Sequence, residues 1–188
     1  MSTKDDGFKR NLFEEAEDKR YTIQNGTTNG TSIVASGPGI DAGIIDLTNN
    51  DTLAWYTDVM REQVWSANIS GYMADFGEFT PTQSDAIYRD KNIDPLEYHN
   101  LYPRQWAEYH SKIIHDLADS PSDAVVFHRS ASLGSGKYMN LFWAGDQTTN
   151  WGRNDGIKSV TSIMAQIDRK STRLNSSHLP TSRMPSSA

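Results

Sequence analysis

The stretch that decides the fold is Gly71–Pro81, which reads GYMADFGEFTP. It begins as a short run of small and apolar residues, as a buried strand of a parallel sheet does. Asp75 falls where that strand should stop, and a carboxylate there is costly unless it has a partner or a chemical role. Gly77 then permits a backbone turn that a side chain would forbid. Taken alone, the stretch predicts either a catalytic carboxylate or an aspartate that caps a loop.

A second stretch, Asn140–Gln147, repeats this design. It reads NLFWAGDQ, an apolar strand followed by small residues and then Asp146. About 70 residues separate Asp75 from Asp146, which is roughly two βα units of an eight-stranded α/β barrel. The two strands would then be next-but-one neighbours, with both carboxylates at the carboxyl edge of the sheet. Two facing carboxylates suit glycoside hydrolysis, and they also suit a divalent metal.

The composition is that of a globular domain. The chain has 188 residues with five Trp, eight Tyr, six Phe and no Cys, which excludes disulfides and thiolate metal sites. Its formal charge of −6 argues against nucleic acid as a partner. There is no apolar run long enough to cross a membrane, and no apolar segment follows Met1, so we expect neither a membrane span nor a signal peptide.

Helical and strand patterns alternate along the chain, which predicts a parallel sheet in an α/β fold. The expected strands are Gly43–Asn49, Ser70–Ala74, Ala124–Arg129 and Asn140–Asp146. The expected helices are Lys9–Lys19, Thr52–Trp65 with Asn50 or Asp51 as its cap, a third from Tyr102 or Pro103 to Leu117, and Gly156–Ala165 capped by Asn154 or Asp155. Asn-Gly pairs within 22–35 predict tight hairpin turns, and an irregular loop is expected from Thr80 to about Asn100. The connection Ser130–Lys137 is too short for a crossover helix, so only a turn is expected there.

The last segment, 168–188, breaks the pattern because it is polar, basic and aperiodic. Residues 168–178 read DRKSTRLNSSH, which resembles the translation of a sequencing-library adapter, and residues 182–188 resemble its continuation. We therefore expect two parts: 1–167 as a fragment of a catalytic domain, and 168–188 as a non-native tail that does not pack on it.

Five stretches, in order, resemble glycoside hydrolase family 31, the retaining α-glucosidase family, and most of all its sulfoquinovosidase-type branch. Two are the aspartate stretches, GYMADFGEF and FWAGDQ. The other three are DAGIIDLTN at 41–49, HRS at 128–130 and DGIKSV at 155–160. The resemblance covers roughly residues 8 to 165 and implies a (β/α)₈ TIM barrel. Because such a barrel needs about 250 residues, the chain would supply only a partial one, roughly strands three to six.

The resemblance also implies roles for individual residues. Asp75 is the expected nucleophile at the end of the fourth strand, and Asp146 the acid/base at the end of the sixth. Arg129 and Trp143 match positions that line the −1 sugar subsite, and Glu78 matches the acidic residue that closes the nucleophile motif. From the residues alone, Arg129 could instead be an ion-pair partner of Asp146, Trp143 could fill the barrel, and Glu78 could cap a loop.

The implied reaction is hydrolysis of an α-glucoside or α-sulfoquinovoside through a covalent glycosyl-enzyme. Asp75 must be ionised to attack the anomeric carbon, and Asp146 must be protonated to donate its proton to the leaving oxygen. No metal or cofactor is required, and a carbohydrate is the expected partner. Two other functions stay open: a non-catalytic sugar-binding remnant, and a divalent-metal hydrolase that would draw on His99, Glu78 and Asp155.

Overall fold

The computed structural model describes residues 10–35, 41–154 and 156–165. It divides into two compact units, Met1–Leu141 and Phe142–Ala188, each of which is described by itself. The expected tail at 168–188 and the expected helix cap Asp155 lie outside the described residues.

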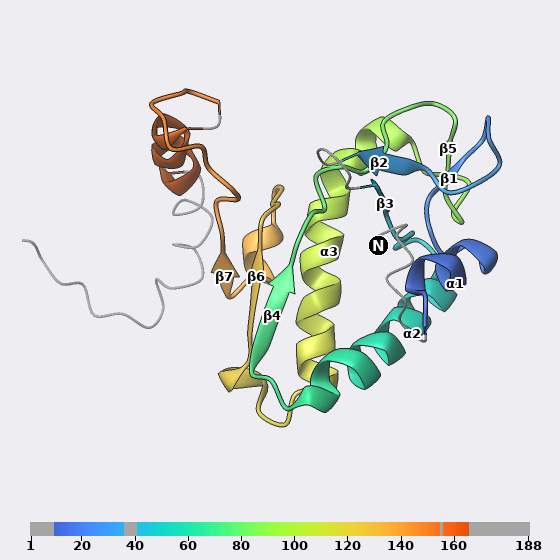
Figure 1. Cartoon of the computed structure of the whole chain (residues 1–188), viewed down its shortest axis with the longest axis horizontal. Coiled ribbons are helices and arrows are strands. Elements are labelled where there is room, and N and C mark those ends of the chain that lie inside the picture. Colours follow the sequence, from blue (N-terminus) through green and yellow to red (C-terminus); the bar gives the residue numbers. More distant parts are fainter. Residues whose placement is uncertain (1–9, 36–40, 155, 166–188) are drawn as a thin grey trace, which may run out of the picture. The chain divides into compact units, whose positions relative to one another are not determined.

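The elements are drawn in Figure 1, and three α-helices account for most of the regular structure. They are α1 (Leu12–Asp18), α2 (Asn50–Val59) and α3 (Pro95–Leu117). Shorter turns are the π-helix η1 (Met60–Val64) and the 3₁₀ turns η2 (Trp65–Ala67), η3 (Pro121–Asp123) and η4 (Ser135–Lys137). The strands are β1 (Gln24–Asn25), β2 (Ile33–Ala35), β3 (Asp41–Gly43), β4 (Gly71–Ala74), β5 (Ala86–Ile87), β6 (Val125–His128) and β7 (Leu141–Phe142). Three sheets result, with strand orders β1-β5, β2-β3 and β4-β6-β7.

The parallel pair β4 and β6 confirms two of the predicted strands. Gly71 pairs with Val125 and Ala74 with His128. The backbones come so close at Gly71 that a Cβ there would lie 2.1 Å from the Val125 carbonyl oxygen, so only glycine fits. At the outer side of β6, the Asn140 side chain accepts from the Val126 amide at 3.1 Å and donates to the Ala124 carbonyl at 2.9 Å.

The predicted strand Gly43–Asn49 is wrong in its bounds and in its sheet. Residues 41–43 form β3, which pairs antiparallel with β2, and Ile45 makes only an isolated bridge to Thr22. Buried Asp46 holds the following turn: its carboxylate accepts from the Thr48 amide and hydroxyl and from the Arg89 amide at 2.6 Å. These bonds favour a turn over a strand. Within the described residues, the sheets do not close into a barrel.

Helix α3 begins earlier than predicted. Asp94 is its N-cap, accepting from the Leu96 amide at 2.8 Å, and Pro95 occupies the first turn. The prediction started the helix later, at Tyr102 or Pro103, and a proline is indeed common in the first turn of a helix. Pro103 instead lies inside the helix, on the face that is buried in the core. The expected loop from Thr80 therefore ends at Asp94 rather than near Asn100.

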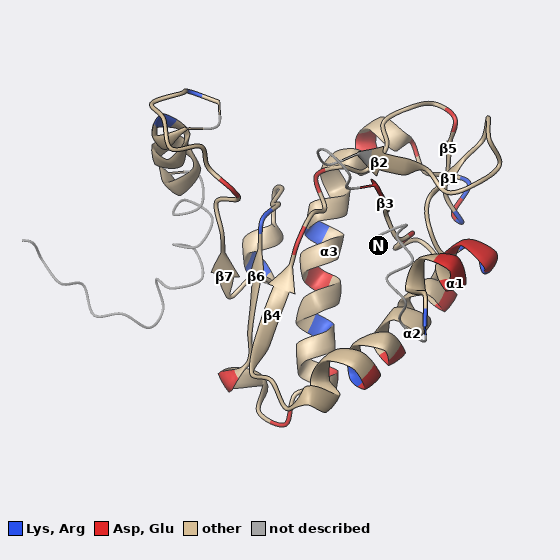
Figure 2. Cartoon of the chain, in the orientation of Figure 1, with Lys and Arg blue, Asp and Glu red and all other residues tan. Residues whose placement is uncertain are grey.

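Helix α2 is capped by Asn49, one residue before the predicted candidates, since its side chain accepts from the Asp51 amide at 3.0 Å. The helix continues through the π-helix η1 and ends at Asn68, whose φ of 54° is left-handed. Helix α1 is shorter than predicted and is capped by Asn11. Figure 2 shows acidic residues along α1.

In the second unit, residues 157–165 form the predicted last helix. Gln147 joins the loop before this helix to the start of the helix. The Gln147 side-chain oxygen accepts from the Ser159 hydroxyl at 2.6 Å, and the Gln147 side-chain nitrogen donates to the Ala144 carbonyl at 2.9 Å. These two bonds join the segment around Gln147 to the start of the helix.

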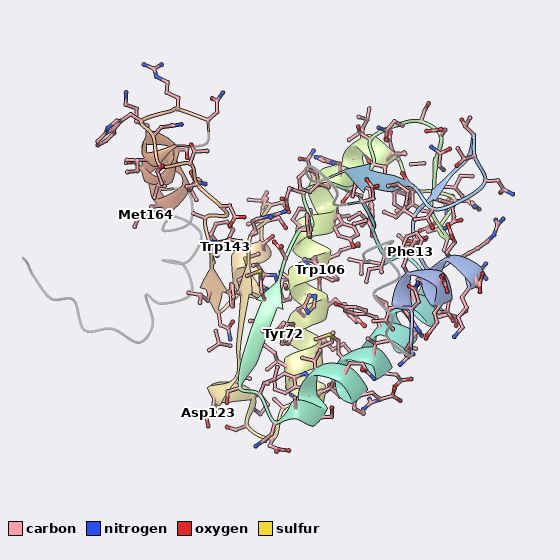
Figure 3. The ribbon with its side chains drawn as sticks, viewed as in Figure 1. Phe13, Tyr72, Trp106, Asp123, Trp143 and Met164 are labelled. Carbon is pink, nitrogen blue, oxygen red and sulfur yellow. The ribbon has the colours of Figure 1, made fainter. Side chains whose placement is uncertain are left out.

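Behind the parallel pair, α3 packs against β4 and β6 with aromatic side chains. Figure 3 shows Tyr72 on β4 and Trp106 on α3. Between these elements lie His110 and His128, each 1% exposed, with ring centroids 5.8 Å apart. His110 Nδ1 is 2.7 Å from the Tyr72 hydroxyl, and the Trp106 ring meets His110 edge-on at 4.0 Å. His128 points into this core, as the alternation with Arg129 along a regular strand predicts.

This histidine pair predicts a loss of stability in acid. Burial lowers the pKa of His128 to about 4 and lowers the pKa of His110 well below its ordinary value. Below pH 6.5 the unfolded chain takes up protons that the folded chain does not. The free energy of unfolding should therefore fall as pH drops from 6.5 towards 4, by up to about 1.4 kcal/mol per pH unit for each histidine. Urea unfolding followed by tryptophan fluorescence at several pH values measures this slope.

A matched pair of variants tests the cause. His128→Asn should flatten the dependence of unfolding free energy on pH between 6.5 and 4, because it removes one buried titrating ring. The control is His115→Asn, which changes an exposed histidine at the end of α3, the helix that carries the buried His110. An equal flattening by both variants would show that the buried rings are not responsible.

Candidate functional site

The site begins where β4 and β6 end. Because Ala74 pairs with His128 in parallel register, the next residues, Asp75 and Arg129, leave the two strands side by side. Arg129 Nη1 lies 3.2 Å from Asp75 Oδ1, and Arg129 Nη2 lies 2.6 Å from Glu78 Oε1. The Arg129 side chain is only 17% exposed, and that of Asp75 is 32% exposed. One guanidinium therefore joins both acidic residues of the GYMADFGEF stretch.

Two phenylalanines border this charge cluster. The Phe76 ring centroid lies 4.4 Å from the Arg129 guanidinium carbon, and that of Phe79 lies 5.8 Å away. The two rings are 5.7 Å apart. A cation over aromatic faces is attracted by the rings, and charges that are partly shielded from water interact more strongly. The rings thus help to hold Arg129 at the carboxylates.

The backbone after Asp75 turns sharply. Phe76 has φ of 61° and Gly77 has φ of 103°, so two consecutive residues have positive φ. The Phe76 amide donates to Asp75 Oδ1 at 2.9 Å, and its carbonyl accepts from the Ser130 hydroxyl at 2.7 Å. A Cβ on Gly77 would lie 2.3 Å from Ser130 Oγ, so glycine is required by both conformation and space.

Two cavities in the first unit adjoin this turn. One, of about 390 Å³, has a mainly apolar lining to which Asp75, Phe76 and Gly77 contribute together with Tyr102 and Trp106. The other, of about 560 Å³, is more polar and includes Glu78 and Phe79 in its lining. Both volumes are within the range of small-molecule sites.

Three of the five predicted site residues are thus in contact: Asp75, Arg129 and Glu78. Asp146 and Trp143 belong to the second unit, where Asp146 is exposed and Trp143 is half-buried. The convergence of Asp75 and Asp146 stays a prediction, and so do all five assigned roles. In the described residues, Arg129 makes ion pairs with Asp75 and Glu78.

The residues named for a metal site are arranged differently from a ligand set. His99 Nδ1 lies 2.7 Å from the Thr80 carbonyl, and Asp155 is outside the described residues. In the part of the chain that the structure describes, no group of three or more His, Asp or Glu side chains could hold a metal ion. In the same part, no helix is long and apolar enough to cross a membrane.

Sequence reasoning assigned no role to Ser130 or to the backbone of Phe76. Ser130 belongs to the HRS stretch that carried the resemblance, but its contact with Phe76 joins residues 54 positions apart. The available signal was its position directly after Arg129 at the end of a predicted strand.

Comparison with known proteins shows the family to which the chain belongs. A sequence model described as "Glycosyl hydrolases family 31 TIM-barrel domain" matches residues 1–165. The chain is 32% identical over 151 residues to a sulfoquinovosidase of Escherichia coli, covering 80% of this chain and 21% of that protein. It is 30% identical over 106 residues to a 1,3-alpha-isomaltosidase of Kribbella flavida, covering 56% of this chain and 14% of that protein.

A solved structure gives the same result. The chain superposes on a family 31 sulfoquinovosidase from E. rectale, bound to an aza-sugar inhibitor, with a TM-score of 0.69 and 33% identity. The match covers 79% of this chain and 22% of that one. The chain therefore spans about a fifth of the length of such relatives. Because the family model matches residues 1–165, well over half of the sequence, the chain belongs to glycoside hydrolase family 31, within its TIM-barrel domain.

Proposed function

We propose that this segment carries the nucleophile and the acid/base of a retaining α-glycosidase. The single observation that carries the proposal is the cluster at the end of β4, where Asp75 is held between the Phe76 amide and the Arg129 guanidinium. A carboxylate fixed by two donors, at a strand end and next to a cavity, suits a nucleophile better than a loop cap. Membership in family 31 supports this reaction class.

Both contacts of Asp75 are to Oδ1, so we assign the attack to Oδ2. Oδ2 bonds to the anomeric carbon as the bond from that carbon to the leaving oxygen breaks. Asp146 gives its proton to the leaving oxygen. In the second step Asp146 takes a proton from water, the water oxygen bonds to the anomeric carbon, and Asp75 departs as a carboxylate. Two inversions retain the configuration.

Arg129 acts in two ways in this mechanism. It places a positive charge beside the Asp75 carboxylate, and it orients Oδ1. Glu78 holds the other arm of the guanidinium, so its contribution is through Arg129. Trp143, which directly follows β7 and precedes Asp146 by three residues, is proposed to offer its ring face to the sugar in the −1 subsite.

The proposed substrates are α-sulfoquinovosides or α-glucosides. The names of the relatives support this range, since one is a sulfoquinovosidase and another a 1,3-alpha-isomaltosidase. The activity is proposed for the complete protein, a protein that carries this segment and matches its relatives over their full length. We infer that the 188-residue chain by itself does not turn over substrate, because its described strands do not form a closed barrel.

The stereochemistry of the first product tests the proposal. The complete protein is incubated with 4-nitrophenyl α-glucoside or 4-nitrophenyl α-sulfoquinovoside, and NMR follows the anomeric proton at early times. The α-anomer should form first and then equilibrate. Initial release of the β-anomer would contradict the covalent mechanism. Sugar binding without hydrolysis would instead favour a carbohydrate-binding module.

A further inference from the structure

We propose that Ser130 is a positioning residue that fixes the direction of the Asp75 carboxylate through the backbone of Phe76. The inference rests on the proposed function, because it concerns the nucleophile of that reaction. It adds a residue that has no contact with the sugar in the proposed mechanism and acts only through the turn after β4.

The contacts form a short chain. The Ser130 hydroxyl donates to the Phe76 carbonyl at 2.7 Å, and the Phe76 amide donates to Asp75 Oδ1 at 2.9 Å. Phe76 therefore contacts the serine with one end of its backbone and the nucleophile with the other. Because the amide and the carbonyl belong to one residue, a displacement of Phe76 as a whole moves its amide relative to Oδ1.

The turn needs a restraint of this kind. Phe76 has φ of 61°, and non-glycine residues occupy this region only where the surrounding structure holds them there. Gly77 follows with φ of 103° and can adopt many other conformations. Ser130 is buried, so its hydroxyl meets the Phe76 carbonyl with little competition from water. The hydrogen bond thus stabilises the backbone conformation that aims Asp75.

Arg129 alone does not supply this restraint. Its Nη1 lies 3.2 Å from Asp75 Oδ1, whereas its shorter contact, 2.6 Å, is to Glu78. Consecutive residues at the end of β6 therefore have separate roles, since Arg129 contacts the two carboxylates and Ser130 holds the backbone between them. Ser130 can do so because the parallel register brings the end of β6 beside the end of β4.

Loss of the hydroxyl should therefore lower kcat while leaving KM nearly unchanged. In the complete protein, Ser130→Ala is expected to reduce kcat on 4-nitrophenyl α-glycosides by about 10- to 100-fold, because small misplacements of a reacting group cost this much. Ser130→Thr retains a hydroxyl and should restore kcat to within a few-fold of the wild type. Ser130→Cys keeps the size but donates weakly, and should give an intermediate kcat.

The matched control is Ser135→Ala. Ser135 is also buried and lies in the same connection, but its hydroxyl oxygen accepts from the Ser132 amide at 2.9 Å. If Ser130 had only a structural role, both alanine variants would lower the melting temperature and neither would change kcat selectively. The inference requires a fall in kcat at Ser130 that Ser135→Ala does not reproduce.

Each outcome supports or overturns the positioning role. Wild-type kcat in a folded Ser130→Ala variant, or an equal loss in Ser135→Ala, overturns the inference. If Ser130→Ala does not fold, Ser130→Cys decides instead, and wild-type kcat there overturns the inference as well. Asp75→Asn is measured alongside. If Asp75→Asn retains turnover, the proposed function is wrong. If Asp75→Asn is inactive but the Ser130 variants have wild-type kcat, only the positioning role is wrong.

Discussion

Replacing Asp75 with asparagine is expected to abolish turnover of every substrate, lowering kcat by roughly four orders of magnitude or more. The amide keeps the size of the side chain but cannot form the ester with the anomeric carbon. The kcat on activated aryl substrates should fall as well, because the missing group is the nucleophile rather than the proton donor. Steady-state rates of the complete protein on aryl and alkyl α-glycosides measure the effect.

A chemical rescue sharpens this prediction. In Asp75→Gly the nucleophile is removed and space is left for a small anion. Azide should then attack the anomeric carbon directly and give a β-glycosyl azide, of inverted configuration. Asp58→Asn, an exposed carboxylate on α2, is the matched control and should keep full activity. Azide products of retained configuration, or none at all, would argue against Asp75 as the nucleophile.

Replacing Asp146 with asparagine should harm substrates in proportion to their need for a proton. A general acid contributes about 10²- to 10⁴-fold, and a 4-nitrophenolate leaves without much protonation whereas an alkoxide does not. The variant should therefore lose far more activity on methyl or disaccharide α-glycosides than on 4-nitrophenyl α-glycosides. The ratio of kcat/KM on the two substrate types, compared with the wild type, is the measurement.

The result for Asp146 can be told apart from a general defect. Asp75→Asn serves as the comparison, because it should lose activity on both substrate types alike. An equal loss on both types after Asp146→Asn would count against its role as acid/base. In that event Asp146, which is exposed within its own unit, would be better explained as a loop residue without a catalytic role.

The strand ends could be predicted from the sequence because their signal is local. Apolar runs that stop at Asp75 and Arg129 predicted the bounds of β4 and β6, and the structure confirms both strands. The burial of individual side chains was harder to predict from the sequence. The run GYMA suggests a strand buried on both faces, yet Met73 is 43% exposed. Burial depends on what packs on each face, which a single run of residues does not encode.

Other features depended on competing signals or on distant contacts. Pro103 suggested a helix start, but Asp94 and Pro95 offered a capped first turn earlier in the chain. The apolar run after Gly43 suggested a strand, but the bonds of Asp46 to Thr48 and Arg89 impose a turn. The ion pair between Arg129 and Glu78, and the contact of Ser130 with Phe76, join residues whose proximity is set by strand register rather than by local pattern.

The sharing of one guanidinium by Asp75 and Glu78 has a consequence for how a sugar can lie. One cation between two ionised carboxylates leaves the cluster with one net negative charge. A ring that gains positive character at its anomeric carbon, as in an oxocarbenium-like transition state, is attracted to such a cluster. A sulfonate is repelled by it. An α-sulfoquinovoside would therefore have to bind with its anomeric carbon towards Asp75 and its sulfonate pointing away from Glu78.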